Sequence, residues 1–559
     1  MEQRRTAAWA ALAAVLAAGA AWLLYIGRGM SFGGDDLYYY MEWVVHAGGS
    51  TVVNHGLEYF FAPANGHLQT VGKVIYRLLF GIFGADYDAF RVVDVLGILA
   101  VAAVFYLLAA RRLGPLLPLA PTILILFLGY AWELSLWAFD MHTVYSLAFG
   151  LGALLALERE DRRGDVAASV LLVLSVFTIE LGLAFVVGAI VLVGQRSRWR
   201  SRAWIVLVPI VLYAIWWVWA RQFGFSTFDL HNLRLLPPDI ADALGSVFGS
   251  ILGLNPTGPE IAPEATATTS AGMVAAGFAV AGLALRLGRG AVPPTLWAFL
   301  AVALAYWTMI ALGGRLPDSS RYVMPGTVMV LLVAADALAG RRFPPLAVAG
   351  AFVLLAVVLP PNIAKFYDGR HKQLIGAQAG RTEFAMMELA GSRISPSYSP
   401  PLDEEVVKLG GSFGPALIPR EYFSAARRYG SLAYSLEQVR EDPIGFRQMA
   451  DAALADAIRL RPRLAAAPAG AGGCEDYDPP APGTLGYLPL PKTGLLLRAR
   501  GGQPVEIRVS RFAKDGGGFE VGQLRPGRWA ILRPGADPAP DPWRLLMGGP
   551  LRVCPAGPA

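Results

Sequence analysis

The stretch AAWAALAAVLAAGAAWLLYIG at residues 7–27 decides the fold class, because it runs for 21 residues without a charge. About 20 apolar residues are enough to cross a bilayer as an α-helix. Further apolar blocks follow along the 559-residue chain, in which 55% of the residues are hydrophobic and 16% are charged. Soluble domains carry roughly a quarter charged residues, so the sequence predicts a polytopic α-helical membrane protein.

Eleven such blocks can be placed along the chain. They lie at residues 7–27, 90–110, 115–132, 143–158, 166–179, 182–194, 203–220, 270–286, 293–313, 321–340 and 344–361. The long block 166–194 is divided at Glu180, because a carboxylate near the middle of a bilayer is costly and a helical hairpin would bring it to the surface. The sequence therefore predicts about 11 transmembrane helices in residues 1–361.

Arginines between the blocks predict the orientation. With the N-terminus inside, every inner gap carries at least two arginines, as the positive-inside rule demands. These gaps are residues 1–5, 111–112, 158–165, 195–202, 286–290 and 341–342. An odd number of spans then places the C-terminal part outside. We expect a multi-pass protein of a bacterial plasma membrane with a cytoplasmic N-terminus, since the alanine- and arginine-rich composition favours a bacterial source.

The polar C-terminal part is predicted to form an extracytoplasmic α+β domain. Residues 362–470 are mixed in character and predicted to be partly helical, whereas the short alternating apolar runs of residues 474–559 predict a small β module. Cys474 and Cys554 are expected to form a disulfide, which requires an oxidising compartment; two unrelated free thiols are the alternative. For the β module, glycan binding and a purely structural cap are both open.

The loops predicted to face outward, residues 28–89 and 221–269, contain the residues best suited to chemistry. The stretch GGDDLYYYMEW at 33–43 places Asp35 and Asp36 just beyond the first span. Apolar side chains recur at helical spacing over residues 71–82, which predicts an amphipathic helix on the outer leaflet. Histidines, carboxylates and several basic residues fall on the same side, so they could line one cavity.

These features together resemble the GT-C superfamily of integral membrane glycosyltransferases, which includes protein O-mannosyltransferases, lipid A aminoarabinose transferases and mycobacterial arabinosyltransferases. The resemblance rests on the Asp35-Asp36 pair, on NGHLQTVGKVIYRLLFGIFGADYDAFRVVD (65–94) and on GGRLPDSSRYVMPG (313–326). It covers roughly residues 1–361. It implies a hexosyl- or pentosyltransferase that takes its sugar from a polyprenyl-phosphate donor. The implied acceptor is a hydroxyl of a cell-envelope glycan, lipid or protein.

The resemblance also implies a role for each candidate residue. An aspartate of the first outer loop, Asp35 or Asp36, is the implied general base, while capping of the next helix is the alternative. The implied ligands of the donor phosphate are Lys73, Arg77, Arg315 and Arg321, whose alternative is snorkelling to lipid headgroups. The implied acceptor or sugar ligands are His55, His67, Glu133, Asp140 and Glu180, whose alternative is a packed or helix-terminal position.

No residue spacing matches a metal signature, so no cofactor is expected to be required, although Asp36 and His67 could help to hold a divalent cation. No long basic run suggests nucleic acid, and the expected partners are membrane lipids, the lipid-linked donor and the acceptor. A lipid-linked glycan polymerase or transporter, or a non-enzymatic envelope-assembly scaffold, are the alternative functions. Replacing both aspartates distinguishes a scaffold from a transferase, because a scaffold tolerates the change whereas a transferase loses turnover.

Overall fold

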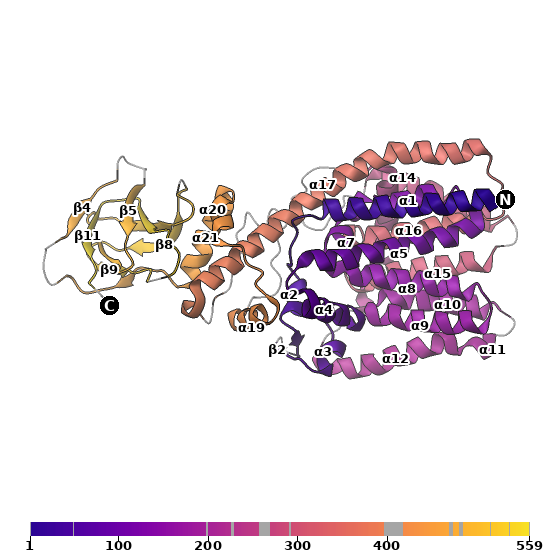
Figure 1. The fold of residues 1–559 in the computed structure, drawn as a ribbon, viewed down its shortest axis with the longest axis horizontal. Coiled ribbons are helices and arrows are strands. Elements are labelled where there is room, and N and C mark those ends of the chain that lie inside the picture. The colour runs from indigo at the N-terminus through magenta and orange to yellow at the C-terminus, as the bar shows by residue number, and fades with distance from the viewer. Residues whose placement is uncertain are drawn as a thin grey trace. The chain divides into compact units, whose positions relative to one another are not determined.

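The fold was analysed in a computed structural model of the whole chain (Figure 1). It describes all residues except 1, 48–49, 197–198, 225–228, 256–268, 290–291, 396–397, 399–417, 469–472, 480–484, 515, 536 and 558–559. The described chain forms two compact units. The helical unit comprises residues 1–30 and 35–374, and the C-terminal unit comprises residues 31–34 and 375–559. The division falls inside helix α17 (Pro345–Ala390), whereas the sequence places the boundary at residue 361.

Each of the eleven predicted blocks overlaps a helix, of which the last, α17, is shared by the two units. These helices are α1 (Glu2–Ile26), α5 (Tyr87–Leu113), α6 (Leu119–Leu126), α8 (Met141–Leu157), α9 (Arg162–Thr178), α10 (Leu181–Gly194), α12 (Trp204–Ala220), α14 (Ser270–Leu287), α15 (Pro294–Leu312), α16 (Ser320–Ala337) and α17. Within the described residues, eight helices are long and apolar enough to cross a membrane, or up to nine if a bent pair counts as one span. The polytopic helical fold is confirmed, and the number eleven stays a prediction.

One of those eight helices was not among the predicted blocks. It is α13 (Leu236–Leu252), which follows the short helix η4 (Leu230–Leu235) and lies within the predicted loop 221–269. Helix α14 packs closely on it, because a Cβ added at Gly272 would lie 2.3 Å from the carbonyl oxygen of Gly245. Part of that loop, residues 256–268, lies outside the described residues.

The predicted span 115–132 is bent. Helix α6 ends at Leu126, and the chain turns by 40° before η1 (Gly129–Ala131) and α7 (Trp132–Leu136). Helix α17 passes directly against this bend, since a Cβ added at Gly129 would lie 1.7 Å from the carbonyl oxygen of Asn362. Only glycine permits that approach, and the bend carries Glu133 on α7 away from the course of α6.

The predicted break at Glu180 is confirmed. Helix α9 ends at Thr178, Ile179 is extended, and α10 begins at Leu181. The two helices pack tightly at the turn, because a Cβ added at Gly182 would lie 2.3 Å from the backbone nitrogen of Val176. The turn therefore places the Glu180 carboxylate at a helix end, as the cost of burying it in the bilayer requires.

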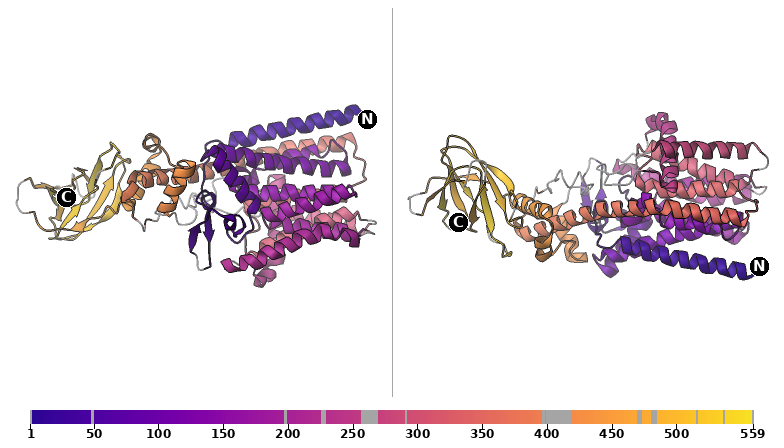
Figure 2. Two further views of the ribbon diagram at one scale, coloured as in Figure 1. Left: turned by 60° about the horizontal axis from the view of Figure 1, so that its bottom comes forward. Right: turned by 90° about the horizontal axis from the view of Figure 1, so that it is seen from above.

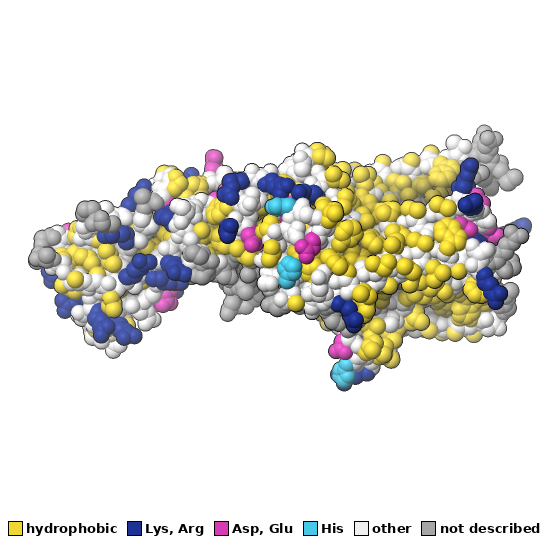
Figure 3. Space-filling view, turned by 90° about the horizontal axis from the view of Figure 1, so that it is seen from below, with side chains coloured by type: hydrophobic (Ala, Val, Ile, Leu, Met, Phe, Trp, Pro, Cys, Tyr) yellow, Lys and Arg dark blue, Asp and Glu magenta, His cyan; other side chains and the backbone are white. Residues whose placement is uncertain are grey.

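The arginine-bearing connections gather at one end of the helical unit. Arg112 binds Glu158 at 2.7 Å and Asp336 at 2.5 Å, and Arg111 binds the other oxygen of Glu158 at 2.6 Å. The N-terminus and α11 (Trp199–Arg202) lie at this end in Figure 1, while the loop elements that follow α1 lie at the other. Between the two ends, hydrophobic side chains cover the helices (Figure 3).

The loop after α1 forms several short elements at the other end of the bundle. They are α2 (Asp36–Tyr40), the hairpin of β1 (Trp43–Val45) and β2 (Thr51–Val53), α3 (Leu57–Phe61) and α4 (Thr70–Phe83), seen from another side in Figure 2. The predicted amphipathic helix is α4, on which Tyr76 and Phe80 are buried while Leu78, Ile82 and Phe83 are exposed. Its position on a leaflet stays a prediction.

The C-terminal unit combines helices with a β-sandwich. Its helices are the end of α17, α19 (Pro419–Tyr429), α20 (Leu436–Glu441) and α21 (Ile444–Ala457). Its strands are β3 (Arg463–Leu464), β4 (Glu475–Tyr477), β5 (Gly486–Leu490), β6 (Leu495–Ala499), β7 (Val505–Ser510), β8 (Phe519–Leu524), β9 (Trp529–Leu532), β10 (Trp543–Met547) and β11 (Leu551–Pro555). They form a four-stranded sheet, β5-β10-β7-β8, and a five-stranded sheet, β3-β9-β6-β11-β4. The predicted small β module is confirmed.

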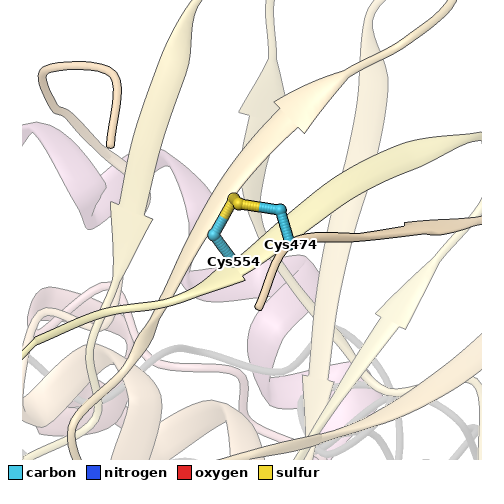
Figure 4. Close-up of a disulfide and its surroundings, with 2 residues drawn as sticks. All are labelled: Cys474 and Cys554. Atoms are coloured by element: carbon cyan, nitrogen blue, oxygen red, sulfur yellow. A yellow bond between two sulfur atoms is a disulfide. The ribbon is translucent and has the colours of Figure 1, made fainter. Parts of the chain in front are cut away.

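The predicted disulfide joins Cys474 to Cys554 across neighbouring strands (Figure 4). Val553 on β11 pairs with Glu475 on β4, so the two cysteines are the next facing positions of the same antiparallel ladder. A link between residues 80 positions apart removes loop entropy from the unfolded chain and stabilises the module by about 4–5 kcal/mol in the chain-entropy model.

Candidate active site

Asp35 begins the loop segment that leads into α2, beyond the end of α1. Its side chain makes no capping hydrogen bond to α2, although it occupies the N-cap position. The capping alternative therefore does not account for this residue. Its carboxylate instead accepts a hydrogen bond from the side chain of Asn65 and lies within electrostatic range of Arg321, His67 and Arg315.

A tight turn presents two of these neighbours. Asn65 and Gly66 both have positive φ, 49° and 82°. The amide of His67 donates to the carbonyl of Ala64 at 2.8 Å, and the reverse bond is 3.0 Å. An Asn-Gly pair suits such a turn, because these residues tolerate left-handed backbone conformations. Asn65 and His67 therefore lie on the two sides of Gly66 in one hydrogen-bonded turn.

Glu180 anchors that loop to the transmembrane helices. One carboxylate oxygen lies 2.7 Å from Nδ1 of His67, and the other accepts the backbone N–H of Leu68 at 2.9 Å. The predicted residues His67 and Glu180 are thus brought together although they are 113 positions apart. Their contact orients the imidazole and fixes the loop to the turn between α9 and α10.

Two arginines supply positive charge near Asp35. Arg321, at the start of α16, forms an ion pair with Glu133 on α7, and the hydroxyl of Ser320 donates to the same carboxylate at 2.8 Å. The buried Nε of Arg321 has no hydrogen-bond partner. Arg315, in the preceding loop, is exposed, and no hydrogen bond or ion pair of its side chain is found among the described residues. Both guanidinium groups therefore retain donors for an anionic ligand.

The surroundings raise the pKa of Asp35. The largest cause is partial burial of the side chain, which disfavours the charged carboxylate and raises the pKa. The hydrogen bond from Asn65 and the charges of Arg321, His67 and Arg315 lower the pKa, but by less. A carboxylate with a raised pKa accepts a proton more readily than an ordinary one. The carboxylate of Asp35 nevertheless lies beside positive charge.

Asp36 differs sharply from its neighbour. It is completely buried, and its two oxygens accept hydrogen bonds from Tyr76 at 2.5 Å and from Trp137 at 2.9 Å. These partners come from α4 and from the segment between α7 and η2 (Ala138–Asp140). Asp36 therefore joins three parts of the unit and fixes the direction of the adjacent Asp35.

Asp140 lies near the same charges. It is 6% exposed, Arg321 interacts with it electrostatically, and its Oδ2 has no hydrogen-bond partner in the described structure. Burying an unbonded carboxylate oxygen is unfavourable, so a donor from outside the chain would relieve a real cost.

Three predicted residues are engaged elsewhere. Lys73 is buried, and its Nζ donates to the carbonyls of Tyr59 at 2.7 Å and of Ala62 at 2.6 Å, while burial lowers its pKa to about 7. Arg77 and His55 both contact the buried carboxylate of Glu42. Lys73 thus caps the end of α3, and Glu42 ties α4 to the segment after the hairpin.

Sequence reasoning missed a buried polar network beside Asp36. The hydroxyl of Tyr39 donates to the side chain of Gln69 and lies 3.2 Å from Nε2 of His142. Gly72 makes room for this imidazole, because an added Cβ would lie 2.0 Å from Nε2. Gln69 and Gly72 carry no recognisable signal in the sequence, since their partner comes from the distant helix α8.

No metal site is evident in the described part of the chain. Within it, no three His, Cys, Asp or Glu side chains gather as the ligands of a metal ion. The two residues considered as ligands have separate partners, since Asp36 binds Tyr76 and Trp137 whereas His67 binds Glu180.

Comparison with known proteins adds little to this geometry. No family model matches the chain, and no curated protein matches it. A similar solved structure is the crystal structure of ArnT from Cupriavidus metallidurans bound to undecaprenyl phosphate, at 16% sequence identity and a TM-score of 0.39. The match covers 77% of this chain and 90% of that one. Agreement at this TM-score is too loose to support an assignment.

Proposed function

We propose that the protein is a membrane glycosyltransferase that moves a sugar from a polyprenyl-phosphate donor to a hydroxyl of a cell-envelope glycan, lipid or protein. One observation carries the proposal. Asp35 is a carboxylate with a raised pKa that caps no helix, and it lies with Asn65, His67, Arg315 and Arg321 at one end of an apolar helix bundle. A base and cations at that depth suit a substrate whose tail stays in lipid.

In the proposed reaction, Asp35 takes the proton of the acceptor hydroxyl while its oxygen attacks the anomeric carbon. The bond from this carbon to the phosphate oxygen breaks, and its electron pair leaves with the polyprenyl phosphate. A single displacement of this kind inverts the anomeric configuration. A positioned base contributes about 10²- to 10⁴-fold to such a step.

Arg315 and Arg321 are the proposed ligands of the departing phosphate. The leaving group gains negative charge as the bond breaks, and guanidinium donors aimed at that charge stabilise the transition state. The ion pair with Glu133 holds Arg321 in place, and its free Nε leaves a donor for a phosphate oxygen. Arg315 is exposed, so its side chain can adjust its conformation to contact the phosphate.

Asp140 and the His67–Glu180 pair are the proposed ligands of sugar or acceptor hydroxyls. Asp140 offers an unbonded oxygen, which a hydroxyl can satisfy as a donor. His67 is 27% exposed, so its ring is reachable although Glu180 binds one nitrogen. The fixed position of these groups would orient the two substrates against Asp35.

The proposed setting is a bacterial plasma membrane, with the Asp35 end extracytoplasmic and the N-terminus cytoplasmic. The arginines Arg111, Arg112 and Arg202 gather at the opposite end of the helical unit, as expected of a cytoplasmic face. The disulfide of the C-terminal unit agrees, because stable disulfides form outside the cytoplasm.

The test is transfer by the purified full-length protein in detergent. It is incubated with a panel of polyprenyl-phosphate hexoses and pentoses and with lipid and glycan extracts, and release of polyprenyl phosphate is measured together with sugar incorporation. We expect turnover with the wild type and with Asp88→Asn, a control at an exposed carboxylate, and none with Asp35→Asn. Sugar transfer that survives in Asp35→Asn would refute the proposed role of Asp35 as the base.

Two other results would indicate the alternative functions. Joining of preassembled glycans alone would indicate a polymerase, and normal envelope assembly in cells carrying Asp35→Asn would indicate a scaffold.

A further inference from the structure

Positive charge is concentrated in the last fifth of the chain. From the end of α21 onward, in residues 459–559, Lys and Arg outnumber Asp and Glu by 14 to 8. The resulting net charge of +6 equals that of the whole protein, so the rest of the chain is neutral on balance. Basic side chains gather over the C-terminal strands in Figure 3. Such a segment attracts anionic partners.

The strand register places two of these arginines side by side. On the five-stranded sheet, Arg498 of β6 faces Arg552 of β11 directly, and its neighbour on the opposite side is Trp529 of β9. Directly opposed residues of an antiparallel pair project from the same face, and like charges in this position destabilise a sheet. The alternating burial of β6 identifies this face as the outer one, since Leu495, Leu497 and Ala499 point inward.

Neither arginine forms an ion pair with a carboxylate in the part of the chain that the structure describes. Arg552 faces Asp476 of β4, but Asp476 lies 3.5 Å from Arg500, which also binds Asp478. The guanidinium of Arg498 lies over the ring of Trp529, 6.0 Å from its centroid, and forms no ion pair among the described residues. Two adjacent guanidinium groups thus remain without a carboxylate, although acidic residues stand on the next strand.

The same face also carries two apolar side chains, together with Arg463 of β3, which faces Ile531, and Asp476 of β4, which faces Arg552. Leu496 and Ile531 face each other across β6 and β9, and both are half-buried, like Trp529. Helix α21 packs against β7 and β8, which belong to the other sheet of the sandwich. The face of Arg498, Arg552, Trp529, Leu496 and Ile531, hereafter the arginine face, therefore combines stacking surface with unpaired positive charge.

We propose that the arginine face binds an anionic glycan, with its carboxylate or phosphate groups on Arg498 and Arg552 and a sugar ring against Trp529. Neighbouring strands lie about 4.8 Å apart, so one oxyanion can accept hydrogen bonds from both guanidinium groups. Trp529 belongs to β9, which lies between β3 and β6 in the sheet, so its ring lies on the face of the sheet, where it can stack on a sugar ring. An anion here also removes the repulsion between the two arginines.

Binding is measured with the full-length protein in neutral phosphatidylcholine nanodiscs, and the probe is an oligogalacturonate. We expect binding that weakens with salt, and no binding of a neutral dextran of equal length. Arg498→Gln/Arg552→Gln should weaken it at least tenfold, since a hydrogen bond to a charged group is lost at each position. The control Arg525→Gln/Arg544→Gln removes the same charge elsewhere in the domain and should change affinity less than twofold.

Several outcomes would overturn the proposal. They are no binding by the wild type, equal losses in the two double variants, or binding of phosphatidylglycerol vesicles but not of oligogalacturonate. Misfolding is controlled by Arg498→Lys/Arg552→Lys, which keeps the charge but loses the bidentate geometry and should give an intermediate loss. The Asp35→Asn variant should bind as the wild type does, so this proposal and the transferase proposal can fail separately.

Discussion

The two ends of the helical unit both carry charge, but they use it differently. At the N-terminal end the carboxylates are paired with arginines: Glu158 binds Arg111 and Arg112, Asp336 binds Arg112, and Asp165 binds Arg202. At the other end, Asp35 has no ion pair within the described residues, and one oxygen of Asp140 is unbonded. Matched pairs hold helices together, whereas unmatched groups at a membrane boundary are available to a ligand.

The largest contrast is expected from Asp35→Asn. Transfer should fall by about 10²- to 10⁴-fold, because the base is lost. The free energy of unfolding should not fall, because a partly buried charge is removed from a site without a direct ion pair. Turnover measured against thermal unfolding in the same detergent checks both. A loss of stability comparable to the loss of turnover would show that Asp35 is a structural residue.

Asp336→Asn at the opposite end should behave in reverse. The change removes one of the two carboxylates that bind the buried Arg112, which keeps its pair with Glu158, so the loss of a hydrogen bond between charged groups should cost about 1.5–3 kcal/mol of stability. Turnover per folded molecule should stay within twofold of the wild type. Chemical denaturation together with active-site titration measures the two quantities, and a selective fall in turnover would break the distinction between the two ends.

Arg315→Gln should reduce turnover by about 10²-fold, the loss typical of one electrostatic donor. Stability should be unchanged, because no ion pair of Arg315 is found among the described residues and the residue is exposed. Arg202→Gln is the matched control at the other end, where the arginine binds Asp165 and turnover should persist. Steady-state kinetics with the lipid donor distinguishes them, and unchanged turnover in Arg315→Gln would remove it from the site.

The smallest expected effect is a shift in pH dependence. Since burial raises the pKa of Asp35 above its ordinary 3.8, turnover should fall on acidification with a midpoint above 3.8, as the base becomes protonated. For stability the sign is opposite. Because the folded protein holds the proton of Asp35 more tightly than the unfolded chain does, protonation contributes to the free energy of unfolding. This contribution is fully present below pH 3.8 and is lost as the pH rises through the pKa of Asp35 in the folded state. Arg321→Gln removes a charge that opposes the shift, so the midpoint should move higher. A midpoint that does not respond to this change would show that the charge of Arg321 does not act on Asp35.

Local signals in the sequence predicted much of the fold. Apolar block length located the helices, and the cost of a carboxylate in the bilayer located the turn at Glu180. Alternation after Cys474 predicted the β module, and the two cysteines predicted its disulfide. The bend at Gly129 was not predictable, because its cause is a carbonyl of α17 more than 200 residues away.

For the site, residue type indicated the chemistry better than the contacts. The neighbours of Asp35 include His67, Arg315 and Arg321, which the sequence named, but nothing in it distinguishes them from Lys73 and Arg77. The partners of Lys73 are backbone carbonyls, which every residue possesses, so no residue type marks them. Asn65 is different, since an Asn-Gly pair is a recognisable turn signal that sequence reasoning could have used.

That Asn-Gly turn also affects the chemical stability of the protein during storage. An asparagine followed by glycine is the dipeptide most prone to spontaneous deamidation, because glycine does not hinder attack of the next backbone nitrogen on the side-chain amide. Deamidation of Asn65 would replace its donor to Asp35 with a second carboxylate, and two adjacent acids hinder each other's ionisation. Stored preparations would then lose the proposed activity gradually, while their fold and their disulfide stayed intact.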